Sequence, residues 1–330
     1  MNKLKPLPEE WSGLLNNEQK EAIENINGPL LIIAGAGSGK TRVLTYRYAH
    51  LIKTYGINFE NVLAITFTNK AANEMKDRIS DLLNLELSPK WISTFHSLCV
   101  KMLRIHGHLI GFNNNFTIYD QSDSTKLVRN CMRDSDIDTK QYSPKRIQAH
   151  ISSLKNQRIL PGEAVEFAQS FFDVKVAEIY SSYQKKLMLA NSMDFDDLLI
   201  KAVELLETSD KSLNYWSSKF QYIMIDEYQD TNMVQYRLVE LLASKHKNIC
   251  VVGDSDQSIY AFRGADIRNI EEFESDFKDA KVISLEKNYR SSQKILDIAN
   301  AVISNNPRKK DKKLWTDNDE GLDVNLVEFN

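Results

Sequence analysis

Short apolar runs alternate with helix-like segments in the first part of the chain. Leu30–Ala34 reads LLIIA, which predicts a strand buried on both faces. Asn61–Thr66 and Trp91–Thr94 predict two further strands. This alternation of strand, turn and helix predicts an α/β fold, with a parallel sheet covered by helices on both faces. Helical spacing of apolar residues predicts the intervening helices over Thr41–Ile52, over Lys70–Leu83 and from about Ser97.

The pattern changes in the middle of the chain. From about Thr117 to Glu207 it is helical, with few strand-like runs. Ser143-Pro144 predicts a helix start, because an N-cap is followed by proline at the first helical position, and Val174–Ala190 predicts a long helix. We therefore predict a helical domain inserted into the sheet domain. Later apolar runs predict strands at Tyr222–Ile225, Ile249–Val252, Lys281–Leu285 and Leu322–Phe329.

Composition and charge narrow the class of protein. The chain has 330 residues, enough for about two domains, and 42% of them are hydrophobic. Lys and Arg total 42 against 45 Asp and Glu, so the net charge of −3 excludes a uniformly basic coat but permits a local basic groove. The only cysteines in the sequence, Cys99, Cys131 and Cys250, form no CxxC pair, so the sequence supports neither a disulfide framework nor a zinc site. So few cysteines favour a reducing, intracellular compartment. No stretch reads as a signal peptide or a membrane span.

The strongest chemical signal is a glycine-rich turn between the first strand and the next helix. It reads AGAGSGKT, the spacing of a phosphate-binding loop, with Ala34 where the first glycine is usual. Glycines let backbone N–H groups face phosphate oxygens, and the helix N-terminus adds partial positive charge. We expect Lys40 to reach the β- and γ-phosphates of a nucleotide and the Thr41 hydroxyl to hold Mg²⁺. The predicted loop residues are Ala34, Gly35, Ala36, Gly37, Ser38, Gly39, Lys40 and Thr41.

Two later strands end in polar residues that suit the same chemistry. Asp226 and Glu227 directly follow YIMI, at the strand end where α/β sheets bind ligands. We expect Asp226 to hold Mg²⁺ and Glu227 to orient and deprotonate an attacking water. Gln257 in GDSDQ is a candidate γ-phosphate contact, and Arg290 in NYRSS is a candidate arginine finger. Taken alone, GDSDQ is equally well explained as an ordinary polar turn, and a lone arginine such as Arg290 is usually a surface residue.

These segments, in this order, resemble the motifs of the UvrD/Rep/PcrA-type DNA helicases of superfamily 1A. LNNEQ at 15–19 resembles the Q motif that reads adenine, with Asn17 where proline is usual. MDFDDL at 193–198 resembles the segment that follows the family's helical insertion. The resemblance covers nearly the whole chain. The segments AGAGSGKT, TFTNKAANEM, STFHS, IDEYQDTN, VGDSDQSIYAFRGA and NYRSS resemble motifs I, Ia, Ib, II, III and IV.

The resemblance implies a RecA-like P-loop NTPase sheet domain with an inserted all-helical domain. Residues 1–116 and 195–285 would form the discontinuous ATP-binding domain, 117–194 the insertion, and 286–330 the start of a second RecA-like domain. The implied activity is ATP-dependent movement in the 3′ to 5′ direction on single-stranded DNA, with unwinding of duplex DNA. Because the family's later motifs are missing, we expect a fragment that binds nucleotide, has little DNA-stimulated ATPase and does not unwind DNA.

The resemblance also implies ligands, partners and further site residues. The ligands would be ATP and Mg²⁺, the partners DNA and unidentified repair or replication proteins, and the location the bacterial cytoplasm. Gln19 would read the adenine edge, while Arg42 and Tyr289 would sandwich the base. Phe262 stands where the family usually has tryptophan, and Ala261 where a polar residue is common. The implied DNA contacts are Phe67, Tyr260 and Phe262 by stacking, and Asn69, His96 and Arg263 to the backbone or neighbouring bases.

Three other functions remain open on the residues alone. They are the motor half of a helicase–nuclease, a nucleotide-binding interaction module without turnover, and a helicase that prefers RNA. Turnover in a Glu227→Gln variant separates a motor from a module. Competition between DNA and RNA separates the last alternative, because the 2′-OH is the physical difference between the two.

Overall fold

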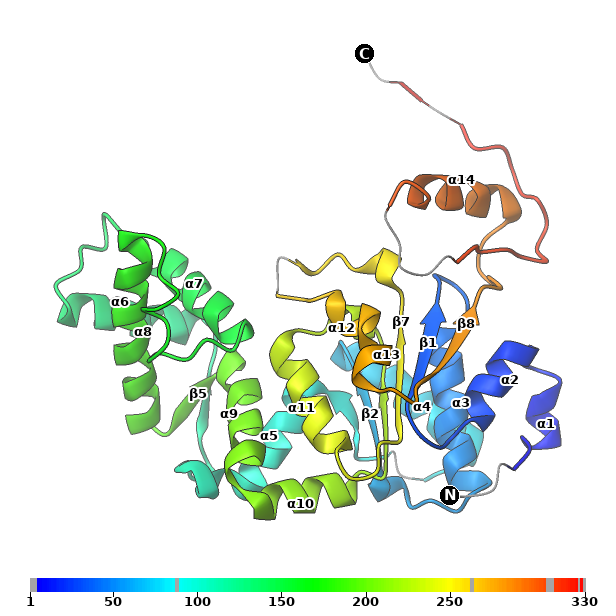
Figure 1. The fold of residues 1–330 in the computed structure, drawn as a ribbon, viewed down its shortest axis with the longest axis horizontal. Helices are drawn as coiled ribbons and strands as arrows, with labels where there is room; N and C mark the ends of the chain where they lie inside the picture. Colours follow the sequence, from blue (N-terminus) through cyan, green and yellow to red (C-terminus); the bar gives the residue numbers. More distant parts are fainter. Residues whose placement is uncertain (1–4, 87–88, 262–263, 307–311, 326, 329–330) are drawn as a thin grey trace.

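The protein is built on a six-stranded parallel sheet with the strand order β3-β2-β6-β7-β1-β8 (Figure 1). The structure, a computed structural model, describes residues 5–86, 89–261, 264–306, 312–325 and 327–328. Every residue of β1, β2, β6 and β7 is buried, as expected of parallel strands covered on both faces. The strands are β1 (Leu30–Ala34), β2 (Val62–Thr66), β3 (Ile92–Thr94), β6 (Tyr222–Ile225), β7 (Ile249–Gly253) and β8 (Lys281–Leu285).

Two hydrophobic cores lie on the two faces of this sheet. Alternate residues of one strand point to opposite faces, so Leu31 and Ile33 enter one core while Leu30 and Ile32 enter the other. One face is covered by α1 (Glu9–Ser12), α2 (Asn17–Glu24), α3 (Lys40–Lys53) and α4 (Asn69–Leu83). The other is covered by α5 (Phe95–His106), α9 (Phe195–Thr208), α10 (Asp210–Lys219), α11 (Met233–Ala243), α12 (Arg268–Glu271) and α13 (Phe273–Asp276).

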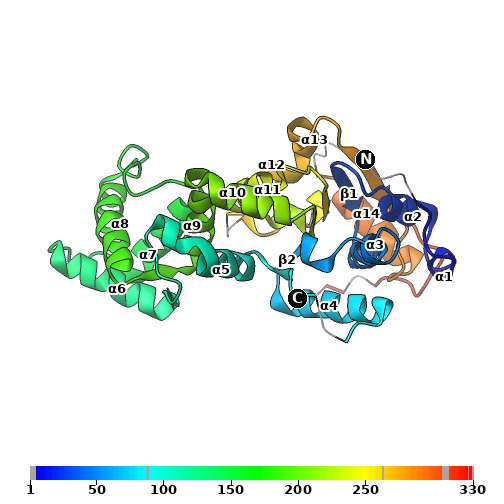
Figure 2. The ribbon, with the colours of Figure 1, turned by 90° about the horizontal axis from the view of Figure 1, so that it is seen from below.

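Three helices between α5 and α9 form a third core of their own. They are α6 (Gln121–Asp134), α7 (Pro144–Asn156) and α8 (Phe171–Leu189), and their apolar residues pack on one another. Figure 2 shows these helices and α1 at opposite ends of an elongated molecule. Two short parallel strands, β4 (Thr117–Tyr119) and β5 (Ser192–Asp194), pair where the chain enters and leaves this helical segment.

After β8 the chain turns back over the carboxyl ends of β1 and β7. Helix α14 (Gln293–Ile303) lies above that end of the sheet in Figure 1. Trp315 then returns beside Lys287, and its backbone N–H donates to Glu286 O. Four short 3₁₀ turns complete the described elements: η1 (Phe59–Asn61), η2 (Gly107–Ile110), η3 (Tyr228–Asp230) and η4 (Ser255–Gln257). Within the described ranges, no helix is both long enough and apolar enough to cross a bilayer.

The predicted strands of the main sheet are confirmed to within a residue or two at each end, but one further prediction is wrong. The stretch Leu322–Phe329 was expected to form a strand, yet its described residues, 322–325 and 327–328, carry none. Leu322 is 92% exposed, and no described strand lies beside the segment to pair with it. Helix α5 also begins earlier than expected, at Phe95, because the Thr94 side chain accepts a hydrogen bond from Ser97 N and caps it there.

Candidate nucleotide and nucleic-acid site

The glycine-rich turn lies between the end of β1 and the start of α3. Gly37 and Gly39 have φ angles of +70° and +89°, which L side chains rarely adopt. A Cβ atom on Gly37 would lie 2.6 Å from the Asn288 side-chain amide, and one on Gly39 would lie 2.9 Å from that of Gln19. The Ser38 hydroxyl donates to Gly35 O at 2.8 Å and closes the turn. These positions therefore need glycine both for their backbone and for the side chains that crowd them.

The structure brings the loop and the acidic pair together, although 185 and 187 positions separate the residues that meet. Lys40 Nζ donates to Glu227 Oε2 at 2.8 Å, and the Thr41 hydroxyl lies 3.4 Å from Asp226 Oδ2. Asp226 directly follows β6, so its carboxylate stands at the carboxyl end of the sheet beside the loop. The oxygens of Thr41 and Asp226 are hard donors of the kind that Mg²⁺ prefers, and they fit that ion.

Electrostatics at this pair favour a bound cation. Burial, followed by the charge of Glu227, raises the pKa of Asp226 from 3.8 to about 6, against the opposing effect of Lys40. Burial and Glu227 likewise raise the pKa of Asp230 to about 6. Lys40 thus faces three carboxyl groups, of which Asp226 and Asp230 are buried, so a further positive charge there would relieve their repulsion.

Gln229 connects the acidic pair to the loop after β7, a role that the sequence did not reveal. Its side-chain NH₂ donates to Glu227 Oε2 at 3.0 Å, and its carbonyl oxygen accepts from Asp254 N at 3.0 Å. Asp254 in turn accepts a hydrogen bond from Gln257, the predicted γ-phosphate contact. One buried amide therefore spans the two strand ends that carry Glu227 and Gln257. Its only signal in the sequence is its place in DEYQD.

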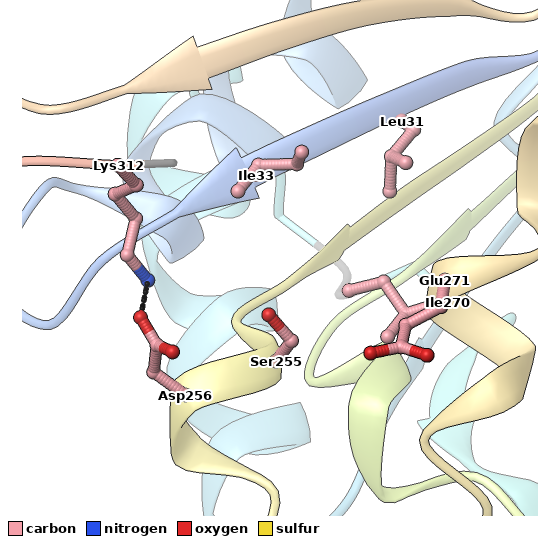
Figure 3. A pocket seen from close by; sticks show the side chains of 7 residues that line it. All are labelled: Leu31, Ile33, Ser255, Asp256, Ile270, Glu271 and Lys312. Carbon is pink, nitrogen blue, oxygen red and sulfur yellow. Dashed lines mark ion pairs between the residues drawn. The ribbon is translucent and has the colours of Figure 1, made fainter. Parts of the chain in front are cut away.

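Lys312 closes the far side of the same loop. Its ammonium pairs with Asp254 and lies 3.2 Å from Asp256 Oδ2, and only 6% of the Lys312 side chain is exposed. Figure 3 shows Lys312 and Asp256 joined as an ion pair. Both line a cavity of about 30 Å³ that is also lined by Leu31 and Ile33 of β1. The segment after α14 is thereby attached to the strand end that bears Gln257.

The residues assigned to the nucleotide base surround the loop. The Gln19 side-chain NH₂ donates to Ser38 O at 3.1 Å, and Gln19 is part of the capping box that starts α2. The Arg42 guanidinium lies 5.7 Å from the Tyr46 ring centre. Tyr289 and Arg290 are exposed beside the loop, and Tyr289 N donates to Gly37 O at 2.9 Å.

Asn288 ties the segment that carries Tyr289 and Arg290 to the glycine-rich loop. The sequence analysis assigned no role to Asn288. Its side-chain NH₂ donates to Ala36 O at 2.6 Å, while its Oδ1 accepts from the backbone N–H groups of Arg290 and Ser291. Asn288 is buried, unlike its two neighbours in NYRSS that were singled out. Asn288 therefore fixes the backbone position of Tyr289 and Arg290 relative to the loop.

A groove of about 870 Å³ lies between the sheet and helices α6 and α7. Phe67 and His96 line it, together with Asp230 and Asn232 after β6. The Phe67 ring centre is 5.5 Å from that of Tyr260, at an angle of 34°. His96 packs on Phe195 with ring centres 5.4 Å apart, and burial lowers the pKa of His96. Two predicted DNA contacts, Phe67 and His96, thus line one surface, and a third, Tyr260, packs against Phe67.

Of the described residues predicted to contact DNA, Asn69 and Tyr260 do not line that groove. Asn69 is exposed at the start of α4 and does not line it. Phe262 and Arg263 lie outside the described residues. Their assignment stays a prediction.

The fold and the site together define the class of protein. A parallel sheet with a phosphate-binding loop after one strand and an acidic pair after another is the arrangement of a RecA-like P-loop nucleoside triphosphatase. Residues 15–278 match the family model of the UvrD/REP helicase N-terminal domain, and residues 283–330 match that of the UvrD-like helicase C-terminal domain. The chain therefore belongs to the UvrD/Rep helicase family, and the family resemblance predicted from its motifs is confirmed.

Two curated relatives illustrate the similarity. The chain is 50% identical over 314 residues to the ATP-dependent DNA helicase PcrA of Staphylococcus aureus. It is 49% identical over 314 residues to the protein of the same name from Staphylococcus epidermidis. Each alignment covers 95% of this chain and 43% of the relative, so the chain spans less than half the length of the relatives it matches.

Proposed function

We propose that this chain carries the ATP-hydrolysing sheet domain of a DNA helicase that moves 3′ to 5′ on single-stranded DNA. The observation that supports this most directly is the meeting of Lys40 and Thr41 with Glu227 and Asp226. Residues 1–116 and 195–285 would form that domain, 117–194 an inserted domain, and 286–330 the start of a second sheet domain. The third hydrophobic core, which is built from residues 119–187, supports this division.

The proposed hydrolysis uses a change of partner at Lys40. A γ-phosphate competes with Glu227 for the Lys40 ammonium, because a triphosphate carries more charge than one carboxylate. Glu227 Oε2 is then able to accept the proton of the attacking water, while Gln229 keeps that oxygen in place. Thr41 and Asp226 would hold Mg²⁺, which supplies charge neutralisation of the triphosphate when bound. Gln257 would contact the γ-phosphate, and Arg290 would stabilise charge in the transition state.

The proposed nucleotide and DNA contacts follow the same surfaces. Gln19 would read adenine, with Arg42 and Tyr289 on either face of the base. Phe67 and Tyr260 would stack on DNA bases, as would Phe262, at roughly 1–3 kcal/mol per base. Asn69, His96 and Arg263 would contact the DNA backbone or neighbouring bases. The substrates would be single-stranded and duplex DNA in the bacterial cytoplasm, with repair or replication proteins as further partners.

The test is hydrolysis and unwinding by the full-length gene product. Single-stranded DNA should stimulate ATPase, and a duplex with a 3′ tail should be unwound in preference to one with a 5′ tail. Glu227→Gln should lower kcat by about 10²–10⁴-fold and leave ATP binding intact, whereas Lys40→Ala should abolish hydrolysis. Glu178→Gln, an exposed acid on α8, is the matched control. Full turnover in Glu227→Gln would refute the assigned chemistry.

The 330 residues taken alone give a second test. We expect them to bind ATP and to unwind no DNA, because stabilisation of the transferring phosphate is assembled from two sheet domains. Nucleotide binding by fluorescence and strand displacement by gel electrophoresis measure the two properties separately. Unwinding by this chain would contradict the proposal.

A further inference from the structure

Asn156, the last residue of α7, lies where four segments of the chain meet. Its side-chain NH₂ donates to Ser152 O in its own helix at 2.8 Å and to Asp196 Oδ1 near the start of α9 at 3.2 Å. Its Oδ1 accepts from Asn232 Nδ2 at 2.6 Å. A Cβ atom on Gly264 would lie 3.1 Å from the Asn156 Cβ, so the loop after β7 also packs here.

The Asn232 contact leads directly to the acidic pair. Asn232 is buried and is the N-cap of α11, where its Oδ1 accepts from Gln235 N at 2.9 Å. The turn before it is closed by Asp230 N donating to Glu227 O and by the Thr231 hydroxyl donating to Tyr228 O. A short, hydrogen-bonded turn therefore connects Asn232 to Glu227.

The other side of Asn156 faces the groove. Asn156 and Asn232 both line it, as do Phe67 and His96. A polymer held in the groove would therefore touch the amide pair itself and not only its surroundings.

Lys155, beside Asn156, anchors the end of α7 to the start of α9. Its ammonium, which has no exposed surface, lies 2.7 Å from Asp194 Oδ2 and 2.7 Å from Asp197 Oδ1. The end of α7 is thus bound to the start of α9 on one side and, through Asn156, to the start of α11 on the other. Separating this ammonium from either carboxylate would leave a buried charge unpaired, so the contact between the end of α7 and the start of α9 is costly to break.

We propose that Asn156 is a positioning residue that couples single-stranded DNA in the groove to the carboxylate turn of the ATP site, through its hydrogen bond to Asn232. The proposal rests on the proposed function, since it explains how DNA raises the rate of hydrolysis. In this proposal Asn156 makes no contact with the nucleotide and takes no part in the chemistry. It determines where Glu227 lies when the groove is filled.

Two single variants in the full-length gene product break this bond from either side. Asn156→Ala removes the acceptor, and Asn232→Ser removes the donor while keeping a side chain that still caps α11. Each should lower the DNA-stimulated kcat by about 5–20-fold, within the range of ordinary coupling between sites. The Kd for ATP and the rate without DNA should change by less than about twofold. The double variant should lose no more than the larger single loss, because both changes remove one interaction.

A matched control removes another contact between asparagines. Asn191 Nδ2 donates to Asn115 Oδ1 at 3.4 Å near β4 and β5, away from the acidic pair, so Asn115→Ala should leave the stimulated kcat unchanged. Hydrogen exchange at residues 228–235 gives a readout independent of turnover: DNA should slow exchange there in wild type and less so in Asn156→Ala.

The outcomes separate the two proposals. A wild-type protein whose ATPase ignores DNA overturns the proposed function and this inference together. A DNA-stimulated wild type with unchanged stimulation in Asn156→Ala overturns the inference alone. Additive losses in the double variant, or a matching loss of ATP affinity, would likewise overturn it, because they indicate general damage to the fold.

Discussion

Glu227 adopts a left-handed backbone conformation, with φ of +50°. For a residue other than glycine this costs roughly 1–3 kcal/mol, which the surrounding structure must supply. The conformation directs the carboxylate to Lys40 and Gln229, both within 3.0 Å. The strain therefore has a role in the proposed mechanism, because it holds a base at the position where the γ-phosphate would meet water.

At the same scale, Asp226→Asn should make the protein more stable while removing its proposed Mg²⁺ ligand. Folding raises the pKa of Asp226 from the ordinary aspartate value of 3.8 to about 6, because the carboxyl is buried and lies beside Glu227. The unfolded state therefore releases this proton first, and the wild type loses stability as pH rises from 4 to 6. At pH 7.5 the variant should be more stable by about 1–3 kcal/mol, and below pH 4 the difference should vanish.

Thermal unfolding of the nucleotide-free protein at pH 4, 6 and 7.5 measures this difference. Asp81→Asn, an exposed acid on α4, should change stability by less than about 0.5 kcal/mol at each pH. A variant no more stable than wild type at pH 7.5 would show that Asp226 does not carry the burial cost inferred for it.

The sequence predicted the charged residues proposed to act on the nucleotide. It did not predict the residues that only hold them in place through hydrogen bonds. Lys40, Asp226 and Glu227 follow from spacing, because a strand end and a glycine turn dictate where such groups lie. Gln229 and Asn288 escaped notice because a side-chain amide is common in polar turns. Their partners, Asp254 and Ala36, are far away along the chain. Only the fold brings donor and acceptor together.

At the scale of elements, the helical insertion is joined to the sheet by a buried charge cluster at the end of α7. Lys155 pairs with Asp194 and Asp197, and the Tyr183 hydroxyl also donates to Asp194. Burial and the charge of Asp194 raise the pKa of Asp197 to about 6, in spite of the lysine. Neither carboxylate is tolerated here without the ammonium.

Lys155→Met should therefore destabilise the protein by about 3–5 kcal/mol, because it leaves two carboxylates buried without a cation. Adding Asp197→Asn should recover part of this loss by removing one of the two charges. Urea unfolding, with hydrogen exchange in α7 and α8 to locate the opening, measures both effects. Wild-type stability in Lys155→Met would mean that the cluster does not hold the joint together.

The sequence predicts an element where the apolar pattern is strong. It does not predict a strand that forms only because two short segments pair with each other. All six strands of the main sheet, β1, β2, β3, β6, β7 and β8, come from runs that were predicted as strands. β4 and β5 have three residues each, and Ser192–Asp194 has a single apolar side chain, so their strand character comes from pairing with each other. The stretch from Leu322 shows the converse: it has an alternating pattern but no described neighbour, and its described residues form no strand.

At the scale of the whole molecule, charge and groove have to be considered together. The net charge of −3 gives the whole molecule no general attraction for DNA, so affinity has to come from a local surface, and a basic groove would make that affinity fall steeply with salt. Among the described residues that line the groove, however, none is a lysine or arginine. Most of them carry aromatic rings, hydroxyls or amides, a few are small or aliphatic, and Asp196 and Asp230 are the acids. This lining suits the faces and edges of bases better than phosphates.

The groove should therefore contribute affinity that salt does not screen. Phe67→Ala should weaken binding of single-stranded DNA by about 1–3 kcal/mol, because a stacked base loses its partner. The slope of log K against log salt should stay that of the wild type, since it counts phosphates that are neutralised and Phe67 neutralises none. Fluorescence anisotropy with a labelled oligonucleotide at several salt concentrations gives both numbers from one titration series. Ile259→Ala, an exposed apolar side chain outside the groove, is the control and should change neither. A slope that becomes shallower in Phe67→Ala would mean that the groove holds the DNA backbone and that its charge comes from residues other than those described as its lining.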